Sequence, residues 1–153
     1  MTEIIIKLFI IIILVYLSIV DIRKMIVPTV GISAIYAAGV IMMLTCDENV
    51  KFYIEGWFFL TISSLAIALF TRGLGGGDVK LLSGLGASLG CHEALKILAF
   101  SFILTGIFVI FIHTYPFKSA RFKTLKTKKE IPFVPFIALS TFLIFTKKLL
   151  YCL

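Results

Sequence analysis

The sequence predicts an all-α, polytopic integral membrane protein with about six transmembrane helices, built as a single domain over residues 1–153. Of its 153 residues, 60% are hydrophobic and only 15% are charged, against roughly 45–50% and about 25% in a soluble domain. A chain of this length has too little interior to hide so much apolar surface from water. The composition therefore excludes an ordinary soluble domain, a disordered chain and a disulfide scaffold.

The apolar residues fall into runs that suit membrane crossing, since about 20 helical residues span the hydrocarbon core. No small-residue cleavage site precedes Asp21, so we interpret the first run as a retained helix rather than a signal peptide. Pro28 stands in the expected first turn of the second helix, where proline is tolerated. The fourth run is short and ends at the polar residues 91–93. The six predicted helices cover residues 4–20, 27–46, 52–71, 79–89, 95–115 and 131–146.

Basic residues predict the orientation of these helices. The net charge is +7, and Lys and Arg gather on the cytoplasmic side of membrane proteins. With both chain ends outside, the cytoplasmic side receives Arg23, Lys24, Arg72, Lys80 and six residues of the 118–129 loop, and the outer side receives Lys51, Lys96, Lys147 and Lys148. The charge then reflects topology, so we expect membrane lipid as a partner and no nucleic acid.

Two of the three aspartates are candidate catalytic residues. Asp21 ends the first predicted helix and Asp78 begins the fourth, so both lie at the cytoplasmic edge, whereas Asp47 lies in the opposite loop. Ionisable groups at membrane depth are costly, about 2.5–3.5 kcal/mol each, and usually functional. Two carboxyl groups that share one proton can activate a water molecule, as in aspartic proteases. Spacing alone leaves open the alternative that both residues only mark helix ends.

The helix dipoles predict unequal roles for the two aspartates. Asp78 lies at a helix N-terminus, where the dipole favours a carboxylate, and Asp21 lies at a helix C-terminus, where it does not. We therefore expect Asp78 to act as the general base and Asp21 to hold the proton.

The glycines at positions 75–77 precede Asp78. Without a Cβ they allow close approach of the backbone and a positive φ, so that Asp78 can meet a partner on another helix. A phosphate-binding loop is disfavoured, because the spacing is not G-x-x-x-x-G-K-[ST] and a carboxylate repels an anion. Lys80 is expected to anchor the helix at the interface or to tune the carboxyl pair. His92 and His113 lack partners at ligand spacing, so no metal site is expected.

Three segments resemble those of the type IV prepilin peptidases. Residues 75–82 resemble the GxGD segment of that family, residues 21–28 are similar to the segment that carries its other aspartate, and residues 132–136 resemble a third. The resemblance implies a catalytic dyad of Asp21 and Asp78. It also implies an active-site loop formed by Gly75, Gly76, Gly77 and Lys80. The substrate cleft that it implies is formed by Pro132, Phe133 and Pro135.

The resemblance implies an aspartic endopeptidase of the cell membrane without a cofactor. It would remove a short basic leader from a prepilin or pseudopilin at the cytoplasmic face, just before the hydrophobic helix of that substrate. The chain departs from the usual family pattern at Thr29, where asparagine is common, and at Val134, where glycine is common. Longer members carry two C-x-x-C pairs that are associated with N-methylation, and this sequence has none, so we expect cleavage without methylation.

Other classes remain open on the sequence. A protease of the signal-peptide-peptidase kind has tyrosine before its first aspartate, where this chain has Val20. Outside enzymes, the alternative is a non-catalytic membrane subunit of a pilus or secretion machine, or a small transporter. A transporter would place polar groups near the bilayer midplane, whereas the aspartates here lie at one edge.

Overall fold

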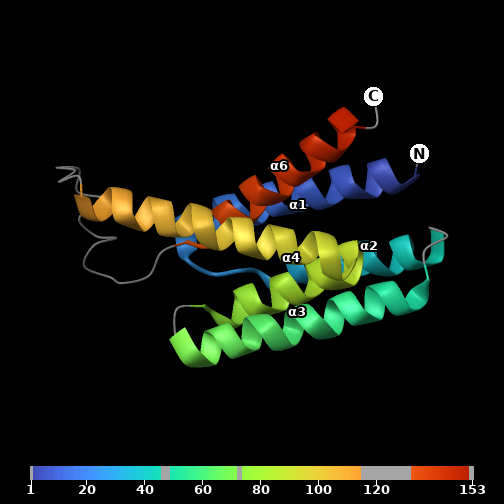
Figure 1. Cartoon of the computed structure of the whole chain (residues 1–153), viewed down its shortest axis with the longest axis horizontal. Coiled ribbons are helices and arrows are strands. Elements are labelled where there is room, and N and C mark those ends of the chain that lie inside the picture. The colour runs from blue at the N-terminus through green and yellow to red at the C-terminus, as the bar shows by residue number, and fades with distance from the viewer. Residues whose placement is uncertain (1, 46–48, 72–73, 115–131, 152–153) are drawn as a thin grey trace.

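The computed structural model describes residues 2–45, 49–71, 74–114 and 132–151. Within these ranges every regular element is an α-helix, as the sequence predicts (Figure 1). The 118–129 loop, which carries much of the basic charge, lies outside the described residues. The helices are α1 (Thr2–Lys24), α2 (Thr29–Thr45), α3 (Val50–Thr71), α4 (Gly76–Thr114) and α6 (Val134–Tyr151).

Helix α4 consists of two stretches that meet at Gly90. This glycine has φ 76° and ψ 172°, which is not a helical conformation, and Figure 1 shows the second stretch running back along the bundle. Glycine adopts such a positive φ without steric cost, and a Cβ at this position would lie only 2.0 Å from the Phe52 ring. The sequence prediction separates the two stretches by polar residues 91–93, but the chain reverses at the single glycine before them.

The first stretch of α4 is the centre of the bundle. Its leucines Leu81, Leu82 and Leu85 are fully buried. Helix α3 crosses it closely, because a Cβ on Gly56 would lie 2.5 Å from the carbonyl oxygen of Gly86. Glycine at the crossing lets two backbones approach and pack tightly in a membrane protein.

Hydroxyl groups join the helices where the bundle is otherwise apolar. Ser83 of α4 lies 2.8 Å from the hydroxyl of Tyr36 on α2, which donates to it, and 2.6 Å from the hydroxyl of Thr61 on α3. On the other side, Ser101 of α4 and Ser140 of α6 form a hydrogen bond of 2.7 Å. These bonds satisfy polar atoms internally and so tie neighbouring helices together.

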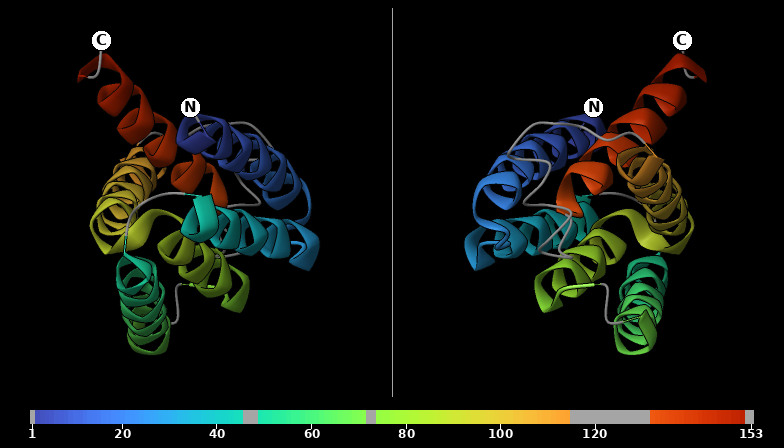
Figure 2. Two further views of the ribbon diagram at one scale, coloured as in Figure 1. Left: turned by 90° about the vertical axis from the view of Figure 1, so that its right-hand side faces the viewer. Right: turned by 90° about the vertical axis from the view of Figure 1, so that its left-hand side faces the viewer.

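Helix α6 lies between α1 and the second stretch of α4 (Figure 2). Helix α1 packs mainly against α6 and α2, and α3 packs on α4 on the far side of the bundle. As a result, the position of α1 relative to the central stretch of α4 is set mainly by the packing of both against α2 and α6.

The exterior of the bundle is apolar. Phe70, Val30 and Leu44 expose 91%, 79% and 76% of their surface. In the part of the chain that the structure describes, three helices are long and apolar enough to cross a membrane, namely Thr2–Lys24, Val50–Phe70 and Gly76–Thr114, and α2 and α6 add shorter apolar helices. Such an extensive exposed apolar surface fits a membrane protein, because lipid tails can cover it where water cannot.

Candidate active site

Asp21 lies in the last turn of α1 and is only 5% exposed. Its Oδ2 atom accepts a hydrogen bond of 3.2 Å from the backbone N–H of Val134, the first residue of α6. The first N–H groups of a helix have no partner within the helix and form the positive end of its dipole. Asp21 therefore accepts a hydrogen bond from a free N–H group at the N-terminus of a helix that begins 113 residues later in the chain.

Asp78 is held by its own helix. The carbonyl of Gly75 accepts hydrogen bonds from the N–H groups of Asp78 and Val79, at 3.0 and 3.2 Å. In return, the N–H of Gly75 donates to Asp78 Oδ2 at 3.2 Å. This is the returning half of a capping box, in which the side chain of the third helical residue bonds to the backbone of the cap. The first turn of α4 thus fixes the direction of the Asp78 carboxyl group.

The two carboxyl groups lie close enough for Asp21 to act on Asp78 electrostatically. They come from α1 and α4, and each accepts a backbone N–H at the start of a helix, α6 for Asp21 and α4 for Asp78. The sequence argument for unequal roles placed only Asp78 at a helix N-terminus. Asp21 does lie at the C-terminus of α1, but folding also brings the N-terminus of α6 to it, so the dipoles of α1 and α4 alone do not decide the two roles.

The glycines before Asp78 behave differently from the sequence prediction. Among the described residues, positive φ values occur only at Gly90 and Met25, so the expectation of a positive φ at positions 75–77 is wrong. Gly76 and Gly77 instead form the first turn of α4. The expected close approach is found at Gly77, where a Cβ would lie 3.0 Å from Val27 Cβ, whereas a Cβ on Gly76 would meet nothing within 4 Å.

The linker from α1 to α2 connects the two halves of the site. Met25 follows α1 with φ 53°, and its N–H donates to the carbonyl of Asp21 at 2.8 Å. This is the left-handed helix ending that glycine usually provides. Two residues later Val27 packs against Gly77. Sequence reasoning missed Met25 and Val27, because no residue pattern marks a left-handed methionine or a contact between distant segments.

At the start of α6, some residues lie beside Asp21 and others pack into the hydrophobic core. Pro132 and Pro135 are partly buried beside Val134, whose N–H bonds to Asp21. Phe133 is only 7% exposed and packs on the Phe102 ring, with ring centroids 5.1 Å apart. Most of the Phe133 side chain therefore serves the core rather than an open cleft. Val134 is fully buried, and its contribution to Asp21 is a backbone donor that does not depend on the side chain.

Lys80 and Asp47 are the remaining predicted positions. Lys80 is exposed near the start of α4, as expected of a residue at an interface. Asp47 lies outside the described residues. The donors that hold the carboxyl groups belong to the main chain, which is why residue types alone did not identify them.

Comparison with known protein families identifies the family of the chain. Residues 8–110 match a family described as the Type IV leader peptidase family. The matched region includes both aspartates and most of the bundle, but it ends before α6. No curated protein and no solved structure matches the chain.

Proposed function

Because the chain belongs to the Type IV leader peptidase family, we propose that it is an intramembrane aspartic endopeptidase that removes the basic leader from type IV prepilin-like proteins. Asp21 and Asp78 are its proposed catalytic dyad. The observation that carries this proposal is that Val27, six residues after Asp21, packs against Gly77, the residue before Asp78, so the end of α1 and the start of α4 meet and Asp21 acts on Asp78 electrostatically. A pair of carboxyl groups in a largely apolar protein suits a shared proton.

The proposed reaction uses one ionised and one protonated carboxyl group. The ionised group takes a proton from a water molecule, whose oxygen attacks the carbonyl carbon of the scissile peptide bond, and the protonated group donates to the carbonyl oxygen. The tetrahedral intermediate then breaks its C–N bond as the amine nitrogen receives a proton from the dyad, and one hydroxyl of the intermediate returns a proton to the dyad as the new carboxyl group forms. The backbone donors of Val134 and Gly75 support this chemistry, because they hold each carboxyl group in one orientation.

We propose that the chain crosses the membrane six times, with the dyad at the cytoplasmic face of the cell membrane. The two stretches of α4 on either side of Gly90 provide the fourth and fifth crossings. Helix α1 begins and α6 ends at one end of the bundle (Figure 1), whereas Asp21 lies in the last turn of α1 and Asp78 in the first turn of α4. The excess of Lys and Arg in the loops of the dyad side supports its cytoplasmic position. A prepilin presents its basic leader on this side of the membrane, where the leader meets a membrane-buried helix.

The test is cleavage of a candidate prepilin by purified protein in detergent or vesicles. Asp21→Asn and Asp78→Asn should each abolish cleavage while the protein remains folded, because each removes a titrating carboxyl group but retains an oxygen that accepts the backbone N–H. Asp47→Asn is the matched control, the same substitution at the remaining aspartate, and should cleave like the wild type. Cleavage by either of the first two variants would refute the dyad. A folded wild-type protein that cleaves no prepilin would favour a non-catalytic membrane subunit.

A further inference from the structure

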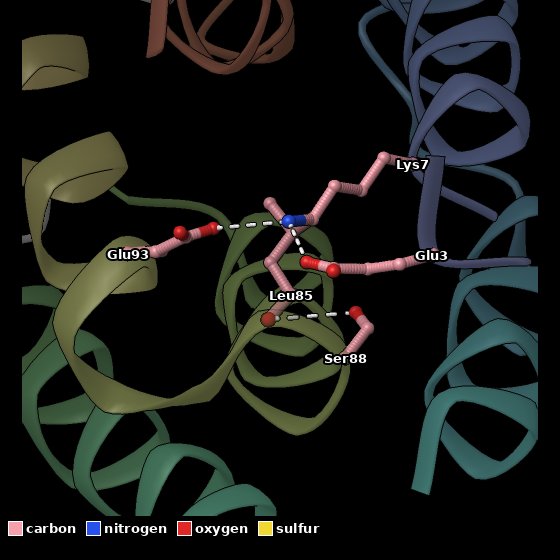
Figure 3. A network of polar contacts seen from close by, with 5 residues as sticks. All are labelled: Glu3, Lys7, Leu85, Ser88 and Glu93. Carbon is pink, nitrogen blue, oxygen red and sulfur yellow. Dashed lines mark hydrogen bonds and ion pairs between the residues drawn. The ribbon is translucent and has the colours of Figure 1, made fainter. Parts of the chain in front are cut away.

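A second group of charged residues lies far from the dyad, around Lys7 in the second turn of α1 (Figure 3). Its ammonium group forms an ion pair with Glu3, one turn earlier in α1, and lies 3.9 Å from Glu93 Oε2 on α4. It also lies 5.5 Å from the centre of the Phe145 ring on α6. One cation therefore contacts three helices that meet at this end of the bundle.

The contact between Lys7 and Glu93 is sheltered from the surroundings. The side chain of Lys7 is 13% exposed and that of Glu93 is 16% exposed. Phe145 beside them is 9% exposed. Charges held within an apolar protein are costly unless paired, so removing one partner here costs more than removing one from a pair on an aqueous surface. The sequence alone does not indicate Glu93 as a partner of Lys7, because the two residues are 86 positions apart in the chain.

We propose that Lys7 and Glu93 form a positioning pair that sets the position of α1 along its axis relative to α4. This axial position also sets where Asp21 lies relative to Asp78. This inference rests on the proposed function, since it assigns a role to residues outside the dyad in the same reaction. Neither residue is a catalytic residue, because both lie at the opposite end of the bundle from the two aspartates.

The geometry explains how a distant pair can act on the dyad. Asp21 lies 14 residues beyond Lys7 on the same helix, which is about 21 Å at 1.5 Å per residue. Asp78 lies 12 residues before Gly90, about 18 Å along the central stretch of α4, and Glu93 follows directly after that reversal. The pair therefore joins two helices of similar length whose other ends carry the two carboxyl groups. A helix is stiff along its axis, so a sliding movement at Lys7 reaches Asp21 undiminished.

The pair of Lys7 and Glu93 adds to the contacts that already relate α1 to its neighbours, which near the dyad are the hydrogen bond from Val134 to Asp21 and the packing of Val27 on Gly77. Helix α1 packs mainly against α6 and α2, rather than along the central stretch of α4. The side chains of α1 interdigitate with those of its neighbours, as Leu17 does with Gly31 of α2, where a Cβ would lie 2.4 Å from Leu17 Cδ2, and such close packing resists sliding. The ion pair of Lys7 and Glu93 contributes a direct contact between α1 and α4 at the end of the bundle opposite the two aspartates.

The test uses charge removal and charge exchange. Lys7→Met and Glu93→Gln each break the pair with little change in shape, and Lys7→Glu combined with Glu93→Lys restores it in reverse. Lys96→Met is the matched control, because it removes a lysine from the same stretch of α4 where the side chain is exposed. Two properties are measured for each protein, the kinetics of prepilin cleavage and the distance between spin labels at Lys24→Cys and His92→Cys. The labelled proteins are made in a background in which the native cysteines are replaced by serine.

We expect each single variant to lower kcat at least about tenfold with little change in KM, since a displacement of about 1 Å in a catalytic site costs roughly a hundredfold. The label distance should change in the single variants, and both properties should recover in the charge-exchange variant. Wild-type kcat and label distance in the single variants would overturn the proposal, as would a charge-exchange variant no better than they are. If the wild type cleaves no prepilin but the label distances change and recover as expected, the proposed function fails and the positioning pair stands.

Discussion

Replacing Gly77 by alanine tests whether the contact with Val27 holds Asp78 in place. The added Cβ would lie 3.0 Å from Val27 Cβ and 3.2 Å from its Cγ2. Carbon atoms in van der Waals contact lie about 3.5–4.0 Å apart. Val27 and the first turn of α4 must therefore separate by about 0.5 Å, and the carboxyl group of the next residue moves with that turn.

The size of the effect follows from this displacement. If a shift of about 1 Å costs roughly a hundredfold in rate, a shift of about 0.5 Å costs roughly tenfold. Alanine also favours the helix over glycine by about 0.5–1 kcal/mol, while overpacking costs about 1–3 kcal/mol. The reference is Gly76→Ala, which brings the same helix preference into the same turn but meets nothing within 4 Å.

The assay compares kcat/KM for prepilin cleavage and the thermal unfolding temperature of the two variants. We expect Gly77→Ala to be roughly tenfold slower than Gly76→Ala and less stable. Combining Gly77→Ala with Val27→Gly removes the clashing Cβ and should recover part of the lost rate. Equal rates for the two alanine variants would refute the reasoning that Val27 positions Asp78.

Three further predictions concern the donors, the core and the topology. Val134→Pro should lower kcat/KM by roughly tenfold or more relative to Val134→Ala. Proline suits the first helical position but removes the N–H that donates to Asp21, a charged hydrogen bond worth about 1.5–3 kcal/mol. Equal rates for the two variants would show that this donor is dispensable. Ser83→Ala should destabilise the protein by about 1–3 kcal/mol in detergent unfolding, since hydrogen bonds to two helices are lost, and an unchanged unfolding temperature would contradict this. A cysteine placed in the 118–129 loop should resist an impermeant reagent applied to intact cells, and labelling from outside would reverse the proposed orientation.

The sequence by itself determined the class of the protein. Its apolar runs cannot be buried within a small domain, and this alone predicts a bundle of apolar helices. The positions of Asp21 and Asp78 at helix ends also follow from local composition. The segments around them resemble those of the prepilin peptidases, and the match over residues 8–110 confirms the family.

The tertiary structure decided what surrounds each aspartate. Asp21 bonds to the N-terminus of α6, Val27 packs against Gly77, and Lys7 contacts Glu93. Periodicity and composition describe neighbours within a turn or two of the chain, whereas each of these contacts joins residues 50 or more positions apart. The donor to Asp21 is a backbone N–H, which every residue but proline carries, so only the folded arrangement of α1 and α6 selects Val134 for that role.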